Sequence, residues 1–474
     1  MKKHFGKNIV ILGASLMCVG ALAGCNSGPE NSETTLNIVC LNRGYGRAWI
    51  DDLITEWEAA NPGYKVHLDA NYNADAVIQK HLYSKDNVDD LYIGCDSAWK
   101  QYAATGLFLN LDSFLEEKVD GVKVVDKING EYNKSIYFGG HTYRLPWTSG
   151  IPGIYYNAKM FKDNRWEVPK TYNELVELCS TIKKAKIRYG NDVMSTQTVA
   201  PFAYTGENLD YFDYAVFTWW AQLSGKEAVD KHLLYESAET FSESNPTFNN
   251  LKKSLQMWWD IFGDTTNYVK GSESWTNFDA QTNFYNGAAA MMINCDWLYN
   301  EIITNTSDKK FRDGFELEIM NTPVAEGAKD EHISYIVGED QYFAIPASTI
   351  KADLAKSFLK LMISDKGIKT FAEKAHGTLA YRSTTTVTAS DNYTQSLINY
   401  SNNAERRFTN WSNSQLFLGD VLDIWSDTHK LPPYLNVINN KKANKADPVG
   451  TYMSLVSSTA ASNWAKWQRD AGVK

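Results

Sequence analysis

Polar and aromatic side chains that could hold a ligand directly follow two short apolar runs near the start of the chain, 36–41 and 91–95. A flat ring covers an apolar ligand face, whereas carboxylate, hydroxyl and guanidinium groups form hydrogen bonds with ligand hydroxyls. This combination suits a ligand whose C–H faces are ringed by hydroxyl groups. The candidate residues are Arg43, Tyr45, Asp96, Ser97 and Trp99. For Asp96, capping of the helix that follows it is an equally good explanation.

The elements that would position these residues alternate between strand and helix. Short apolar runs predict strands, and apolar residues at steps of three, four and seven predict amphipathic helices. In chain order we expect a strand at 36–41, a helix at 47–60, a strand at 65–70, a helix at 74–83 and a strand at 91–95. This order predicts an α/β fold with a parallel sheet covered by helices, in which ligands bind at the carboxyl ends of the strands.

Further elements of both kinds follow along the chain. A hairpin is predicted around Gly139 and Gly140, and Thr171 and Glu174 have the spacing of a capping box at the start of a helix. The other expected elements are strands at 154–156, 288–293 and 342–345, one long amphipathic helix at 351–375 and a C-terminal helix at 451–474.

The composition limits the classes of protein that need to be considered. The chain has 474 residues, of which 43% are hydrophobic, so it is long enough for about two or three domains with substantial cores. The formal net charge of -9 argues against a nucleic-acid partner, which requires a clustered basic surface. The 15 tryptophans exceed what packing alone would lead us to expect, so we predict that some of them line a ligand cleft.

The sequence gives no sign of an enzyme. It contains no GxSxG, GxxxxGK or HExxH motif, and its histidines and cysteines do not have metal-ligand spacing. We therefore predict no catalytic residue, no metal and no cofactor. The widely spaced Cys40, Cys95, Cys179 and Cys295 are interpreted as core residues, with one bridge between Cys40 and Cys95 left open.

The first 24 residues have the features of a secretory signal peptide. Lysines precede the apolar run 9–20, and small residues follow it. Leu22-Ala23-Gly24-Cys25 resembles the lipobox of bacterial lipoproteins, which implies cleavage before Cys25 and a diacylglycerol on its thiol. Residues 25–35 would then form a lipidated tether at the extracellular face of the cell membrane. The alternative is a plain signal peptide in which Cys25 has no role.

Several segments together resemble the extracellular solute-binding proteins of sugar ABC transporters, a family that includes maltose-binding-protein-like receptors. They are Tyr143–Trp147, Tyr156–Phe161, Val168–Leu175, Phe284–Ile293 leading to Asp296-Trp297, and Pro323–Pro346. The resemblance implies a periplasmic-binding-protein-like fold, with two hinge-linked α/β lobes and a ligand cleft between them. Lobe I would comprise 36–148 and 333–382, and lobe II would comprise 153–325 and 383–474. It also implies a monomer that binds ABC transporter permease subunits.

The same resemblance adds candidates for the cleft. Trp297 follows the motif after which sugar-binding members often place a stacking ring, although it could also pack the core of lobe II. Asp296 precedes it, and Gly338, Glu339 and Asp340 lie where the chain would return to lobe I. For Trp147 a cleft role and a core role are equally good, whereas core packing is favoured for Tyr211. Trp411 and Arg382 complete the set.

We therefore expect a lipid-anchored protein that captures a carbohydrate, in particular an oligosaccharide, and delivers it to an ABC transporter permease. One alternative is a sugar-sensing protein that presents its ligand to a membrane receptor. A second is the same fold with a peptide or polyamine as ligand. A third is a carbohydrate-active enzyme that uses Asp296 and Glu339, for which the separation of the two carboxylates would have to be right.

Overall fold

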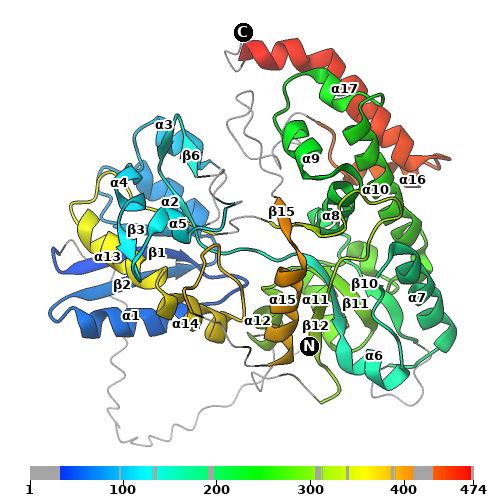
Figure 1. Ribbon diagram of the computed structural model, residues 1–474, viewed down its shortest axis with the longest axis horizontal. Helices are drawn as coiled ribbons and strands as arrows, with labels where there is room; N and C mark the ends of the chain where they lie inside the picture. The colour runs from blue at the N-terminus through cyan, green and yellow to red at the C-terminus, as the bar shows by residue number, and fades with distance from the viewer. Residues whose placement is uncertain are drawn as a thin grey trace, which may run out of the picture.

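Two α/β units, which we call lobe I and lobe II, lie side by side (Figure 1). Lobe I contains a five-stranded sheet and lobe II a four-stranded sheet. The two-lobed α/β fold expected from the sequence is confirmed. The computed structural model describes residues 32–94, 98–130, 132, 136–189, 197–304, 311, 313–337, 341–385, 389, 391–408 and 431–470.

The sheet of lobe I has the order β2-β1-β3-β14-β8. Its strands are β1 (Thr35–Leu41), β2 (Lys65–Asn71), β3 (Leu91–Gly94), β8 (Leu145–Pro146) and β14 (Tyr342–Ala344). β1 runs parallel to β2 and β3, as the alternation of strand and helix predicts, and β14 runs antiparallel to β3 and β8. The carboxyl ends of β1, β2 and β3 therefore meet at one edge.

Helices cover both faces of this sheet. On one face α1 (Ala48–Ala60) packs with α13 (Ala352–Met362) and α14 (Asp365–Ala375), and on the other lies α2 (Ala74–Leu82). Successive residues of β1 are buried on opposite faces, because side chains alternate along a strand. The single helix predicted for 351–375 is wrong, since Ser364 ends the first helix and caps the second by accepting a hydrogen bond from the Gly367 amide.

The sheet of lobe II has the order β10-β11-β9-β12. Its strands are β9 (Gly153–Asn157), β10 (Ala200–Ala203), β11 (Ala289–Asn294) and β12 (Leu317–Met320). Next to it, α7 (Tyr172–Ala185) begins with the predicted capping box, in which Thr171 and Glu174 bond to each other's backbone amides. α15 (Asn392–Asn403) packs on β12.

A helical layer rich in aromatic rings completes lobe II. α8 (Asp213–Ser224) is buried along its whole length and packs against α10 (Pro246–Phe262), which in turn contacts α17 (Pro448–Asp470). Figure 1 shows α17, in red, lying along α10. The buried rings of Trp219, Trp220 and Trp258 lie in this layer, so core packing accounts for several of the tryptophans.

The remaining elements are short or lie around the two sheets. The helices are α3 (Trp99–Ala104), α4 (Asp112–Leu115), α5 (Val124–Lys127), α6 (Ala158–Asn164), α9 (Lys226–His232), α11 (Asn277–Tyr285), α12 (Leu298–Thr304) and α16 (Leu435–Lys442). The strands are β4 (Lys118–Val119), β5 (Val122–Lys123), β6 (Tyr137–Phe138), β7 (His141–Thr142), β13 (Ile333–Tyr335) and β15 (Arg406–Phe408). β6 and β7 form the predicted hairpin.

Three chain segments connect the lobes, and the residues of them that the structure describes are 147–152, 336, 337, 341, 376–385, 389 and 391. The backbone amide of Trp147 donates to the Gln341 carbonyl at 2.8 Å, and that of Ser149 donates to the Thr378 carbonyl at 2.9 Å. The Val337 amide donates to the Gly150 carbonyl at 3.1 Å. These bonds hold the three connections side by side, so that they can flex together. The lobe boundaries expected from the sequence remain a prediction. The strand β13, at the start of the second segment expected for lobe I, pairs with β15 and packs on α8 of lobe II.

Cys40 is a buried free cysteine, so the bridge to Cys95 that the sequence left open is not formed. Cys95 itself lies outside the described residues, as does the whole segment 1–31. Within the part of the chain that the structure describes, no helix could cross a bilayer, and no group of histidine, cysteine and acidic side chains could hold a metal ion.

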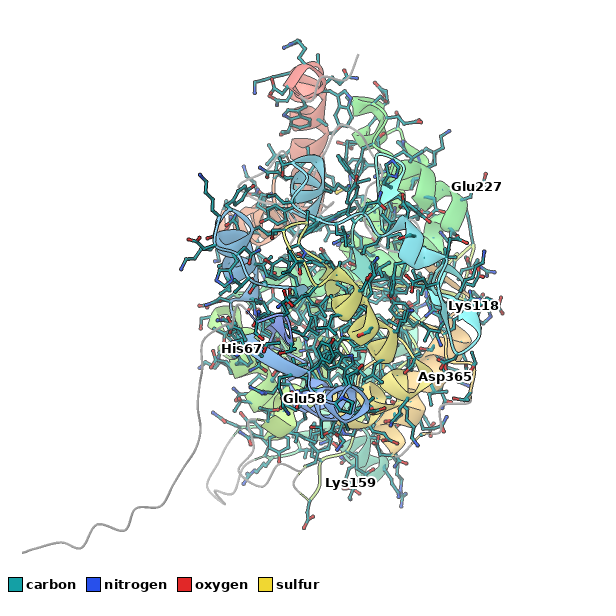
Figure 2. All side chains as sticks on the ribbon, turned by 90° about the vertical axis from the view of Figure 1, so that its left-hand side faces the viewer. Glu58, His67, Lys118, Lys159, Glu227 and Asp365 are labelled. Atoms are coloured by element: carbon teal, nitrogen blue, oxygen red, sulfur yellow. The ribbon has the colours of Figure 1, made fainter. Side chains whose placement is uncertain are left out.

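A buried lysine ties the third connection to lobe I. Figure 2 shows the molecule from the side of lobe I and labels Asp365, the first residue of α14. The Nζ atom of Lys127 lies 3.1 Å from the Asp365 carboxylate and 2.7 Å from that of Asp120, and Lys127 itself is 1% exposed. Asp365 in turn accepts a hydrogen bond from the Thr384 amide. Burial opposes ionisation of Asp365, but the bonds from Thr384 and Lys127 outweigh it and lower its pKa to about 2.

We expect Lys127→Met to reduce the free energy of unfolding by about 2–3 kcal/mol, because it leaves two partly buried carboxylates without their cation. The network is stabilising above pH 3.8, the ordinary pKa of Asp365, and its contribution disappears as the pH falls from there to about 2. Urea unfolding at pH 7 and pH 3 should show a smaller difference between variant and parent at pH 3. Lys123→Met is the matched control, since Lys123 pairs with Glu116 at the surface, where solvent screens the interaction, and its loss should change stability little at either pH.

Candidate functional site

The site lies where the loop after β1 meets the chain after β11. The Tyr45 hydroxyl of lobe I donates a hydrogen bond of 2.6 Å to Oδ1 of Asp296 in lobe II. The other carboxylate oxygen accepts from Thr378, at 2.9 Å from the amide and 2.7 Å from the hydroxyl. Tyr45 and Asp296 are 251 residues apart in the sequence, so only the folded chain brings these two predicted site residues together.

The Asp296 carboxylate is fully buried. Burial raises its pKa above the ordinary value, because a charge is less well solvated inside the protein, and the hydrogen bonds from Tyr45 and Thr378 oppose that rise. A third group fixes the backbone of Asp296, since the Tyr393 hydroxyl of α15 donates to its carbonyl at 2.6 Å. Asp296 is therefore held by both lobes and by the third connection.

Aromatic rings surround Trp297. Its ring is edge-on to those of Tyr45, Tyr211 and Tyr214, with centroid separations of 6.1, 6.5 and 6.4 Å. Trp297 is 7% exposed and Tyr211 is partly exposed. The structure thus places one ring from lobe I and three from lobe II at the junction, including Tyr211, for which the sequence favoured core packing.

Glycines allow this close approach of the lobes. A β-carbon at position 44 would lie 2.6 Å from Cβ of Trp297, so only glycine fits there without displacing the tryptophan. Asn300 of lobe II donates to the Gly44 carbonyl at 2.7 Å. Gly46 has a positive φ of 63°, which turns the loop into the start of α1.

Arg43 contacts Tyr72, an aromatic residue that the sequence did not identify as a candidate. Its Nε donates to the Tyr72 carbonyl at 2.8 Å, and its guanidinium carbon lies 4.6 Å from the centre of the Tyr72 ring. Tyr72 follows β2, at the same sheet edge as the loop after β1, and is 54% exposed. The signal that could have revealed it is the one used for Tyr45, an aromatic residue directly after a predicted strand.

Two predicted tryptophans lie inside lobe I. Trp147 is fully buried, and its ring packs against Trp49, Phe343 and Phe371 at centroid separations of 5.0–5.2 Å. This placement favours its core role. Trp99 is also fully buried, beneath the guanidinium group of Arg144 at 4.2 Å.

Other predicted residues are not brought to Trp297. Arg382 is exposed and donates to the Asn129 side chain at 3.3 Å, near the Lys127 network. The remaining predicted site residues lie outside the described residues: Asp96, Ser97, Gly338, Glu339, Asp340, Trp411 and, at the N-terminus, Cys25. Ligand contact by any of the predicted residues remains a prediction.

The described part of the junction is suited to binding. Its flat rings offer apolar surfaces, and its one described carboxylate, that of Asp296, is already bonded to protein donors. Two lobes joined by three connections, with aromatic rings at their junction, define a two-lobed solute-binding receptor.

The comparison with protein families agrees with this class. The model of the bacterial extracellular solute-binding protein family matches residues 43–369, and the chain belongs to this family. Its members bind solutes and are not enzymes. A multiple sugar-binding protein of Streptococcus mutans is 23% identical over 370 residues, which cover 77% of this chain and 80% of that protein.

Solved structures show the same fold. RafE from Streptococcus pneumoniae without ligand is 17% identical, with a TM-score of 0.65 over 92% of this chain and 100% of that chain. A chitin oligosaccharide binding protein is 16% identical, with a TM-score of 0.61 over 92% of this chain and 99% of that chain. A structure of RafE in complex with raffinose matches with a TM-score of 0.64, at 16% identity over 90% of this chain and 99% of that chain.

We expect Gly44→Ala to weaken the interlobe contact, because the new methyl group must displace the Trp297 side chain or the loop. Overpacking of this kind costs about 1–3 kcal/mol. Thermal unfolding and the emission of the tryptophans would report it as a lower midpoint and a red shift. Gly130→Ala is the matched control, since nothing lies within 4 Å of a β-carbon there. Identical behaviour of the two variants would contradict the close approach at Gly44.

Proposed function

We propose that this protein captures a carbohydrate, in particular an oligosaccharide, at the junction of its lobes. The observation that carries the proposal is the group of four rings formed by Trp297, Tyr45, Tyr211 and Tyr214. Aromatic faces complement the C–H faces of sugar rings, and tyrosine hydroxyls supply donors and acceptors for sugar hydroxyls. Of the four, Tyr211 is the partly exposed one, so it is the first of these rings that a ligand would meet.

The relatives support a carbohydrate ligand. Their descriptions name multiple sugars, raffinose and chitin oligosaccharides. The exposed ring of Tyr72 at the same edge of the lobe I sheet would give a longer ligand a second apolar platform. An oligosaccharide could then extend from the junction along the carboxyl ends of β1 and β2.

The proposal includes delivery of the ligand to the permease subunits of an ABC transporter. Closure of the lobes around the ligand would change the outer surface, so that a permease could recognise the loaded form. A signal peptide at 1–24, a lipid on Cys25 and a tether at 25–35 would keep the protein, as a monomer, at the outer face of the membrane.

A cationic ligand is less well matched to the junction. A polyamine requires carboxylates that face it, whereas the Asp296 carboxylate is buried and bonded to Tyr45 and Thr378. Presentation of a sugar to a membrane receptor would use the same site, and the identity of the membrane partner would distinguish it from delivery to a permease.

Ligand binding should depend on the Trp297 ring. A thermal-shift screen of the parent protein should show stabilisation by one group of oligosaccharides, with about 2.7 kcal/mol expected at a ligand concentration 100 times Kd. Trp297→Ala should weaken affinity for that ligand about tenfold or more in calorimetric titration, because Trp297 is the ring against which the three tyrosines of the junction pack.

Trp259→Ala is the control for this experiment. Trp259 is a partly buried ring on α10 that contacts Lys441 and Trp258, and its loss should leave affinity unchanged. A parent protein that responds to peptides or polyamines and to no sugar would overturn the carbohydrate proposal.

Membrane attachment should depend on Cys25. In the bacterial host, Cys25→Ser should move the protein from the membrane fraction to the soluble fraction and abolish incorporation of labelled palmitate, because serine lacks the thiol that carries the lipid. Cys40→Ser is the control, since that thiol is buried. Membrane retention and labelling of the Cys25 variant would show that the lipobox assignment is wrong.

A further inference from the structure

The Gly44-Tyr45-Gly46 segment has a role that sugar binding does not explain. It follows β1 in lobe I, yet both Gly44 and Tyr45 form hydrogen bonds with lobe II. Tyr45 is 1% exposed, so its ring and hydroxyl are turned into the protein and away from solvent. A residue that only contacted ligand would be expected to keep an exposed face.

The Tyr45 ring packs between residues of lobe I and lobe II. It packs against Phe371 of α14 at 5.2 Å and edge-on to Trp297 of lobe II at 6.1 Å. A β-carbon at Gly377 would lie 2.4 Å from its ring carbon Cε1, so a glycine in the third connection is needed to admit the ring. The seat of Tyr45 is therefore built from lobe I, lobe II and the connection between them.

The Asp296 carboxylate completes the contact. The Tyr45 hydroxyl from lobe I and the Thr378 amide and hydroxyl from the third connection donate to its oxygens, and the Cys295 thiol of lobe II lies 3.5 Å from Oδ1. Opening of the lobes at this point would break the bond to Tyr45, whereas the bonds within either lobe could persist. Hydrogen bonds gain strength where water is excluded.

We propose that Tyr45 and Asp296 form a latch between the lobes that favours their closed arrangement both with and without ligand. In this role both are positioning residues, which fix the approach of the lobes and seat the neighbouring Trp297, and ligand contact falls to the other rings of the junction. The bond from Asn300 to the Gly44 carbonyl supports the same contact. The latch sets the ratio of closed to open protein, and this ratio scales the apparent affinity for any ligand that binds the closed form.

The proposal goes beyond the identity of the ligand, so it can be tested without one. Spin labels on Lys85→Cys in lobe I and Lys231→Cys in lobe II, two exposed positions, would report the distance between the lobes by pulsed electron resonance. The labelled chain would carry Cys18→Ser, Cys25→Ser and Cys95→Ser, and the other three cysteines, Cys40, Cys179 and Cys295, are buried. Without ligand, the parent should already show a population at the shorter distance, and ligand should enlarge it.

Tyr45→Phe keeps the ring in its seat and removes the hydroxyl. It should shift the closed-to-open ratio about tenfold or more toward the open form and so enlarge the population at longer distance, because the hydrogen bond between the lobes at the Asp296 carboxyl group is lost. Asp296→Asn should act in the same direction, since an amide nitrogen would replace one of the two oxygens that accept these bonds.

Tyr172→Phe is the matched control, because its hydroxyl donates to the Met257 carbonyl at 2.8 Å within lobe II. This variant should lower the thermal midpoint without changing the interlobe distance. An unchanged distance distribution in Tyr45→Phe would overturn the latch, as would a parent protein that is already open. Neither result would bear on carbohydrate binding, which the ligand screen tests separately.

Discussion

The arrangement of the two lobes depends on one buried carboxylate. The carboxyl group of Asp296 loses its contacts with water on burial, and Tyr45 and Thr378 supply hydrogen bonds in their place. Those donors come from lobe I and from a connection between the lobes, whereas the carboxyl group belongs to lobe II. Satisfying one buried carboxyl group therefore requires three separate parts of the chain to meet at one point.

The rest of the junction follows from that requirement. With Asp296 fixed, the next residue, Trp297, is placed against Gly44, where no side chain larger than hydrogen fits. The three connections run beside one another through backbone hydrogen bonds, so any movement of the lobes must bend them together. A structure of this kind can open and close as two bodies, which suits a protein that must enclose a solute and then release it.

The aromatic richness of the chain has two physical origins. Many of the rings fill the helical layer of lobe II, where large flat groups bury much apolar area, and Trp219, Trp220 and Trp258 are examples. A smaller group lies at the junction around Trp297. Sequence composition cannot separate these two uses, because the same residue type provides core volume in one place and a ligand surface in the other.

The sequence by itself determined the local elements and the class of fold. Apolar runs and helical spacing predicted β1, β2, β3 and the helices between them, and the capping box at Thr171 appears as predicted, because these signals act over a few neighbouring residues. The prediction of one long helix failed at Ser364 for a reason that is equally local. Ser364 caps a second helix there, although the apolar pattern continues through this position.

Only the tertiary structure decided what the candidate residues touch. Trp147 could have faced a cleft or a core, and the packing of Trp49, Phe343 and Phe371 placed it in the core. Tyr45 and Asp296 were separate candidates until folding joined them across 251 residues. Such contacts depend on how the two lobes meet. A sequence pattern that repeats every two to four residues does not report which distant residues will come into contact.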